Sequence, residues 1–279
     1  MDISILVTSC SLYKNIWDPF IFLLRKHWSD CDIHIYIGCD KYLSQEEKEK
    51  YLKQNINFII TEIEPYAKNY TSRIIDYISK IPTKYIILMQ EDVLITKKVN
   101  NTEIKECYNL LNSNNIFNGI RLHGIGCDSG EGNEINLTNI TLREMLHTQK
   151  YWFSWATTMW NKDKLINILT NANFKNLNTE DSETNITNYM KGKNEKILSI
   201  SCSSKRNIIE YIGIGAINGG IVSNNYVNYL KSENIPIKLY ENDCIYDKNS
   251  KDLHKYNNND EYYINTQNIV IKKTKLNKI

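Results

Sequence analysis

The feature that most constrains the fold is the regular alternation of apolar runs and helix-like segments over residues 3–89. Apolar runs of strand length occupy 3–8, 32–38, 57–61 and 84–89. The stretches between them have helical spacing over 16–28, 44–54 and 71–80, and the second of these opens with a capping-box pattern. Strands that alternate with helices predict a mostly parallel sheet with right-handed crossovers, which is the α/β class.

The second half of the chain is less regular. We expect strands over 116–122, 196–201 and 206–215, and helices over 101–114, after Lys162, over 179–191 and over 224–233. Residues 123–140 are rich in Gly and polar side chains, which predicts a long loop of the kind that is usually functional or disordered. We expect 1–240 to form one domain, and 241–279 to be a polar C-terminal segment that packs on it or is partly disordered.

Composition argues against several classes of protein. A net charge of +2 gives no electrostatic reason to expect binding to nucleic acid or to an anionic membrane. No run approaches the roughly 18–20 apolar residues that cross a bilayer, and the first residues lack the basic region of a signal peptide. The 7 Cys include no CxxC pair, which argues against a zinc ribbon or a thioredoxin-type site. These features predict a cytoplasmic protein without a transmembrane segment.

The most informative motif lies at 85–96, where the apolar sequence YIILM is followed by Gln90, Glu91 and Asp92 and then becomes apolar again. Carboxylates at the end of a core strand cost free energy unless something pairs with them. A divalent cation with its diphosphate is one such partner, because Mg²⁺ or Mn²⁺ binds one or two carboxylates together with phosphate oxygens. A solvated surface turn is the alternative, although the apolar residues after Asp92 argue against it.

Several motifs, taken in their order along the chain, resemble those of GT-A glycosyltransferases. Gln90-Glu91-Asp92 stands where that family has its acidic DxD metal ligands, and 9–13 resembles its donor-base loop. The segments 71–81, 151–165, 179–185 and 215–235 resemble, in the same order, its later motifs, so the likeness covers roughly residues 3–240. Each motif is loose, and their collinear order is the more specific signal. Gln90 replaces the first acid of the strict motif, which leaves one metal ligand fewer.

The resemblance implies a GT-A-like three-layer α/β/α sandwich and a glycosyltransferase. Such an enzyme moves a sugar from a nucleotide-sugar donor, such as a UDP-sugar, to a glycan or another hydroxyl acceptor. The donor-binding residues that the resemblance implies are Ser9, Tyr13, Asp40, Arg73, Glu91 and Asp92. Asp92 would be the ligand of a Mn²⁺ or Mg²⁺ ion.

The resemblance also implies an inverting transfer, which needs a carboxylate as general base. Glu180 best matches the family's position, and Glu183 is the second candidate. The alternative for these acids is a helix N-terminus capped by Thr179, where carboxylates are favoured by the helix dipole. We place His123 and Trp155 on the acceptor side. The alternative for His123 is a loop histidine without a functional role, and the alternative for Trp155 is a tryptophan of the hydrophobic core.

Two other functions stay open at this point. A nucleotidyltransferase shares the α/β architecture and the acidic strand end, but it usually has a basic, Gly-rich first loop. Residues 8–15, TSCSLYKN, have no Gly and one Lys. A non-catalytic protein that binds nucleotide sugars or carbohydrates is the other possibility, and Gln90 is the residue that favours it.

Overall fold

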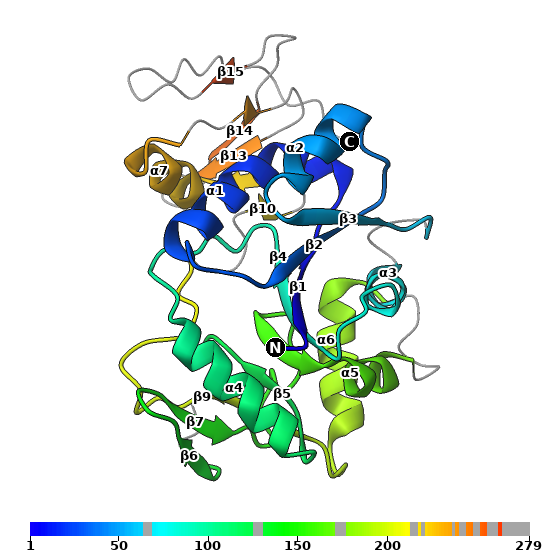
Figure 1. Cartoon of the computed structure of the whole chain (residues 1–279), viewed down its shortest axis with the longest axis vertical. Helices are drawn as coiled ribbons and strands as arrows, with labels where there is room; N and C mark the ends of the chain where they lie inside the picture. Colours follow the sequence, from blue (N-terminus) through cyan, green and yellow to red (C-terminus); the bar gives the residue numbers. More distant parts are fainter. Residues whose placement is uncertain are drawn as a thin grey trace. The chain divides into compact units, whose positions relative to one another are not determined.

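The computed structural model describes residues 1–63, 69–124, 131–170, 177–212, 217–218, 221–235, 238–239, 244–247, 252–255 and 262–263 (Figure 1). The chain divides into two compact units. The first unit consists of Met1–Ser11, Asp30–Gln90 and Lys97–Glu210, and the second consists of Leu12–Ser29, Glu91–Thr96 and Tyr211–Ile279.

The first unit contains a 9-stranded sheet with the order β3-β2-β1-β4-β8-β5-β9-β7-β6. Its strands are β1 (Ile3–Thr8), β2 (His34–Cys39), β3 (Ile56–Ile60), β4 (Tyr85–Gln90), β5 (Phe117–Arg121), β6 (Glu134–Asn136), β7 (Thr141–Glu144), β8 (Thr158–Asn161) and β9 (Lys196–Ile200). Strands β3, β2, β1 and β4 are mutually parallel, and β8 is antiparallel to both β4 and β5. Because β9 is parallel to β5, the strands β1–β5 and β9 all run in one direction.

Helices cover both faces of this sheet, so the first unit has three layers. Its helices are α2 (Gln45–Leu52), α3 (Tyr70–Ser79), α4 (Asn101–Ser113), α5 (Lys162–Leu169) and α6 (Thr179–Met190). Ile86 and Leu88 of β4 belong to a buried cluster with residues of α3, α5 and α6. Tyr85 points to the opposite face, because side chains alternate along a strand, and its ring packs edge-on against Tyr108 of α4. The expected α/β/α arrangement is therefore present.

Local sequence explains where these elements begin. All residues of β1 are buried, which is typical of a parallel strand covered on both faces. The capping box that opens α2 is formed by the Ser44 side chain and Glu47. Helix α6 is capped by the side chain of Asn178, which accepts from the Asp181 N–H. The expectation that Thr179 is the cap was therefore wrong by one residue.

The second unit contains η1 (Ser11–Ile16), whose first residue belongs to the first unit, and α1 (Trp17–His27). Its other elements are β10 (Ile217–Asn218), β11 (Ile221–Ser223), α7 (Asn224–Ser232), β12 (Lys238–Leu239), β13 (Cys244–Asp247), β14 (Asp252–Lys255) and β15 (Tyr262–Tyr263). Lys26 of α1 forms an ion pair with Glu233, directly after α7. Ile95 bridges Tyr211 in antiparallel fashion, which ties the segment after β4 to this unit.

Two sequence predictions of secondary structure were wrong. The expected loop 123–140 contains β6, which pairs with β7 in a hairpin. The expected strand 206–215 is absent over 206–212, where only an isolated bridge at Tyr211 occurs. Residues 213–215 lie outside the described part. The predicted boundary at residue 240 stays a prediction.

Within the described residues, the structure contains no helix that is both long enough and apolar enough to cross a membrane.

Gly38 in β2 allows the ring of Tyr77 to lie directly on the strand. A Cβ atom at this position would lie 2.6 Å from Cδ2 of Tyr77, which is far inside van der Waals contact. We predict that Gly38→Ala lowers the free energy of unfolding by about 1–3 kcal/mol, as overpacking in a core does. Urea denaturation measures this, with Thr102→Ala on the exposed face of α4 as the control. Equal stability of wild type and Gly38→Ala would contradict this packing.

Candidate functional site

The carboxyl ends of several strands meet at one edge of the sheet in the first unit. Thr8 ends β1 beside Gln90, which ends β4, and Cys39 ends β2 next to them. The antiparallel β8 begins at this same edge, because Thr158 pairs with both Leu88 and Arg121. Ligands of open α/β sheets bind beyond this edge, which we call the carboxyl edge.

Tyr70 joins the ends of β1 and β4. Its hydroxyl lies 3.1 Å from Oγ1 of Thr8 and accepts a hydrogen bond from Nε2 of Gln90 at 3.4 Å. Helix α3 starts at Tyr70, so the first turn of this helix is held at the carboxyl edge. Gln90 therefore has a hydrogen-bonding role within the fold, in which its side-chain amide donates to the hydroxyl of Tyr70.

A carboxylate is held next to Tyr70 through Trp155. The backbone N–H of Trp155 donates to Oε1 of Glu183 at 2.7 Å, and its indole N–H donates to Oγ of Ser182 at 2.8 Å. The rings of Tyr70 and Trp155 pack edge to face with centroids 5.0 Å apart. Glu183 is half-buried. The ring of Trp155 is only 2% exposed, which is the packing that the core-tryptophan alternative predicts.

The start of α6 is fixed to the start of α3 by two further hydrogen bonds. Thr71 N–H donates to the Leu177 carbonyl, and Leu177 N–H donates to Oγ1 of Thr71, each at 3.3 Å. The start of α6, whose fifth residue is Glu183, is therefore anchored at the carboxyl edge. Glu180 is the second residue of α6, but its side chain is outside the described part of the structure.

Asp40 ties the loop after β1 to the end of β2. Its carboxylate accepts hydrogen bonds from both the backbone N–H and the hydroxyl of Ser11. Burial would raise the pKa of Asp40, but the hydrogen bonds to its carboxylate, first among them that from the Ser11 N–H, together outweigh burial, so the pKa is lowered and the group is ionised at neutral pH. Ser9 is fully buried and its N–H donates to the Gly38 carbonyl at 2.9 Å. The structure thus brings Ser9 and Asp40 together.

Arg73 places a buried positive charge in the first turns of α3. Its side chain is 1% exposed, and Nη2 donates to the Tyr77 hydroxyl at 2.8 Å. Burial raises the pKa of Tyr77, so the phenol stays protonated. Burial also raises the pKa of the Cys39 thiol to about 11, so this neighbouring group is neutral as well. The guanidinium is therefore the positive charge of this cluster, and the ionised Asp40 is its negative charge.

His123 follows β5 at the carboxyl edge. Its Nδ1 lies 3.1 Å from the Ile209 carbonyl, and because a carbonyl only accepts, Nδ1 carries the proton. Burial lowers the pKa of His123, since it disfavours the charged form. The imidazole is neutral at pH 7, and it lines a pocket described below.

The remaining predicted donor residues belong to the second unit. Glu91 is 6% exposed and Asp92 is half-buried, so Glu91 is not in the solvated turn that the alternative interpretation required. Tyr13 lies in η1 at a non-helical kink with φ −105°. Within the described residues, no group of three or more His, Cys, Asp or Glu side chains is arranged to hold a metal ion.

Sequence reasoning missed several residues of this edge, namely Ser11, Tyr70, Tyr77 and Ser182. Ser11 lies inside the 9–13 motif, and a polar residue at the start of a helix after a strand was the available signal. Tyr70 lies one residue before the 71–81 motif, and nothing in the sequence pairs its hydroxyl with Thr8 or Gln90.

The sequence of the Gly-rich segment 213–220 predicts a turn. Residues 213–216 and 219–220 of this segment lie outside the described part of the structure.

Comparisons with known proteins give matches to solved structures only. No family model matches the sequence, and the comparison with curated proteins gives no match either. Residues 1–349 of S. aureus TarS in complex with UDP-GlcNAc are 13% identical with a TM-score of 0.44, covering 75% of this chain and 60% of that one. The glycosyltransferase GlyE of Streptococcus pneumoniae TIGR4 is 12% identical with a TM-score of 0.42, covering 70% of this chain and 44% of that one.

A cytidylyltransferase from Leptospira borgpetersenii serovar Hardjo-bovis (strain JB197) is similar too, at 9% identity and a TM-score of 0.44, covering 76% of this chain and 82% of that one. Glycosyltransferases, the family that the sequence resembles, are thus among the similar structures. Because all these TM-scores lie below 0.5, we infer the function from the side chains alone.

We predict that Asp40→Ala lowers the free energy of unfolding at pH 7 by about 1.5–3 kcal/mol, the usual worth of hydrogen bonds to a charged group. The folded pKa of Asp40 lies below the ordinary 3.8, so its contribution is complete above pH 3.8 and is lost as the pH falls through the folded pKa. Urea denaturation at pH 7 and at pH 3 measures both effects, with the exposed Asp32→Ala as the control. A difference that grows on acidification would contradict the assignment.

Proposed function

We propose that this chain is a nucleotide-sugar-dependent glycosyltransferase that transfers a sugar to a hydroxyl acceptor. The observation that carries the proposal is a carboxylate, Glu183, fixed by the Trp155 N–H at the carboxyl edge of an open α/β sheet. Such a sheet binds ligands at this edge, and a transferase that activates an acceptor hydroxyl needs a positioned base there.

The donor would lie over the ends of β1 and β2. The loop that contains Ser9 and Ser11 is held by Asp40, so it offers a rigid surface to the nucleoside. Arg73, which is permanently charged, supplies positive potential for a leaving group that becomes a nucleoside diphosphate. We assign Ser9, Asp40 and Arg73 to the donor side on these grounds, and Tyr13 on its sequence motif.

Glu183 would act as the general base. It accepts the proton of the acceptor hydroxyl while the acceptor oxygen bonds to the anomeric carbon of the donor sugar. The bond from that carbon to the diphosphate oxygen breaks, and its electron pair leaves with the diphosphate. Attack opposite to the leaving group inverts the anomeric configuration. Glu180, which is the first candidate on its sequence position with Glu183 second, stays an alternative for the same role, since it precedes Glu183 by three residues on the same helix.

Asp92, with Glu91 beside it in the sequence, would hold a divalent cation. Mg²⁺ or Mn²⁺ uses one or two carboxylates and completes its coordination with phosphate oxygens and water, so two adjacent acids, one buried and one half-buried, fit such an ion. When bound, the cation would neutralise charge on the diphosphate.

The first prediction concerns the base. Glu183→Gln retains an oxygen for the Trp155 N–H but cannot take a proton, so kcat should fall about 10²–10⁴-fold. The dissociation constant of the UDP-sugar, measured by isothermal titration, should stay within about twofold, because only the chemical step is affected.

Asp181→Asn, an exposed carboxylate on the same turn, is the matched control and should leave kcat unchanged. If Glu180→Gln has the large effect and Glu183→Gln does not, Glu180 is the base. Release of pyrophosphate with formation of a nucleotidyl-sugar would contradict glycosyl transfer and indicate a nucleotidyltransferase.

The second prediction concerns the cation. Asp92→Asn removes a charged ligand, so the concentration of Mn²⁺ that gives half-maximal turnover should rise at least about tenfold, as loss of a charge-assisted contact implies. Thermal melting without Mn²⁺ should be unchanged. Full activity of Asp92→Asn at the same Mn²⁺ concentration would remove Asp92 from the site.

A further inference from the structure

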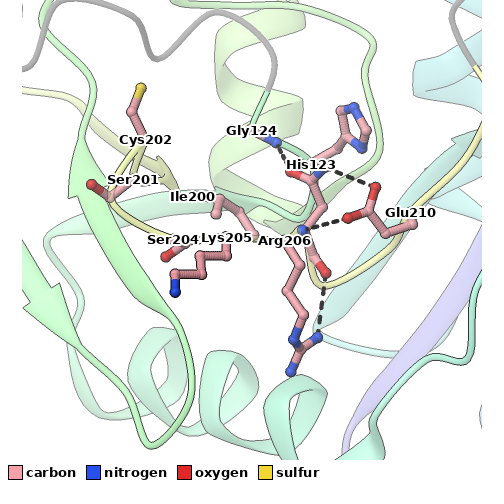
Figure 2. Close-up of a pocket in the computed structure, with 10 residues that line it drawn as sticks. His123, Gly124, Ile200, Ser201, Cys202, Ser204, Lys205, Arg206 and Glu210 are labelled. Atoms are coloured by element: carbon pink, nitrogen blue, oxygen red, sulfur yellow. Dashed lines mark hydrogen bonds between the residues drawn. The ribbon is translucent and has the colours of Figure 1, made fainter.

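A pocket of about 310 Å³ lies at the carboxyl edge beyond β5 and β9, and we call it the β5–β9 pocket (Figure 2). Its lining consists of His123, Gly124, Ile200, Ser201, Cys202, Ser204, Lys205, Arg206, Asn207 and Glu210. Polar groups dominate this lining, and the volume is at the lower end of the range for small-molecule sites. The pocket is therefore suited to a small polar ligand of about one sugar ring.

The walls of the pocket are fixed by hydrogen bonds. Arg206 makes a two-pronged ion pair with the fully buried Glu103, with Nη1 to Oε2 at 3.1 Å and Nη2 to Oε1. Asn207 donates to Glu210 from its backbone N–H at 2.9 Å and from its side chain at 3.1 Å, and it accepts from the Gly124 N–H. The pocket is thus formed before a ligand arrives.

These contacts decide the charge that the pocket presents. The Arg206 cation is neutralised by Glu103, and Glu210 lies 4.0 Å from Lys97. His123 contributes no charge at pH 7, because burial lowers its pKa. Lys205 is exposed, and among the described residues no side chain forms a hydrogen bond or an ion pair with its ammonium group. The remaining charge of the lining is therefore positive.

The β5–β9 pocket lies at the same edge of the sheet as the end of β4. Thr158 of β8 pairs with Leu88 on one side and with Arg121 on the other, so Gln90 and His123, each two residues further on, lie at a similar level. Two strand spacings separate β4 from β5, which is about 10 Å. A ligand the size of a disaccharide can therefore reach from the pocket to the end of β4.

We propose that the β5–β9 pocket binds the acceptor, and that the acceptor is a carbohydrate with a phosphate or carboxylate group that pairs with Lys205. The assignment of this ligand as the acceptor rests on the proposed function. The binding of an anionic sugar to the pocket can be tested without turnover. A lysine ammonium acts as a point charge, so it can pair with a phosphate group or with a carboxylate group of the sugar.

The exposed Cys202 in the pocket lining provides a direct measurement. The rate at which iodoacetamide alkylates Cys202 in the full chain is followed by peptide mass spectrometry, with glucose 6-phosphate, glucuronate and methyl glucoside as probes. We expect the two anionic sugars to slow alkylation with saturation and the neutral sugar not to do so. Whichever anionic sugar slows alkylation more at the same concentration identifies phosphate or carboxylate as the preferred group.

Lys205→Ala should weaken this protection at least about tenfold, the cost of losing a charge-assisted contact, and Lys205→Arg should restore it. The exposed Lys98→Ala, outside the pocket lining, is the control and should behave as wild type. Lys205→Ala should leave the dissociation constant of the UDP-sugar unchanged.

Equal protection by charged and neutral sugars, or protection by neither, would overturn the proposal. Protection by the UDP-sugar that Lys205→Ala abolishes would assign the pocket to the donor instead. If the anionic sugars bind as expected but no nucleotide sugar binds, the pocket stands and the proposed function fails.

Discussion

The hydroxyl of Tyr70 is the contact on which the arrangement of the candidate site depends. It meets Thr8 at the end of β1 and Gln90 at the end of β4, while its ring packs on Trp155. Trp155 in turn holds Glu183 through a backbone N–H. A carboxylate on α6 is thereby positioned relative to strand ends that are distant in the sequence. Position is what a general base requires, because proton transfer needs hydrogen-bond reach.

The charged groups at the carboxyl edge are stabilised by different contacts, and these contacts give them different roles. Asp40 is ionised and uses its carboxylate to hold the loop at Ser11. Arg73 is buried against Tyr77, so packing fixes the position of its charge, whereas the charge of a surface side chain moves with that side chain. In the β5–β9 pocket the Arg206 and Glu103 charges cancel, which leaves Lys205 to select the ligand. The edge thus combines fixed structural charges with few charges that are available to ligands.

Sequence patterns were sufficient for the first half of the fold because each element there has its own local signal. The buried run of β1, the capping box at Ser44 and the helical spacing of α3 all identify their elements without tertiary information. The β6–β7 hairpin was missed because its strands are short and polar, and because β7 is stabilised by pairing with the distant strand β9. Among residues of the candidate site, Asp40 was a candidate from the sequence and Glu183 the second candidate for the base, whereas Tyr70 was not a candidate, since its hydrogen bonds join residues 62 and 20 positions away.

A crystal structure of the full chain with an intact nucleotide sugar tests the central claim most directly. We expect the nucleoside against the loop held by Asp40 and the sugar on the Glu183 side of the β4 end. The anomeric carbon should then face a space in which an acceptor hydroxyl can reach the carboxylate of Glu183 within hydrogen-bonding distance. A nucleotide bound away from the carboxyl edge, or a sugar separated from Glu183 by protein, would contradict the account.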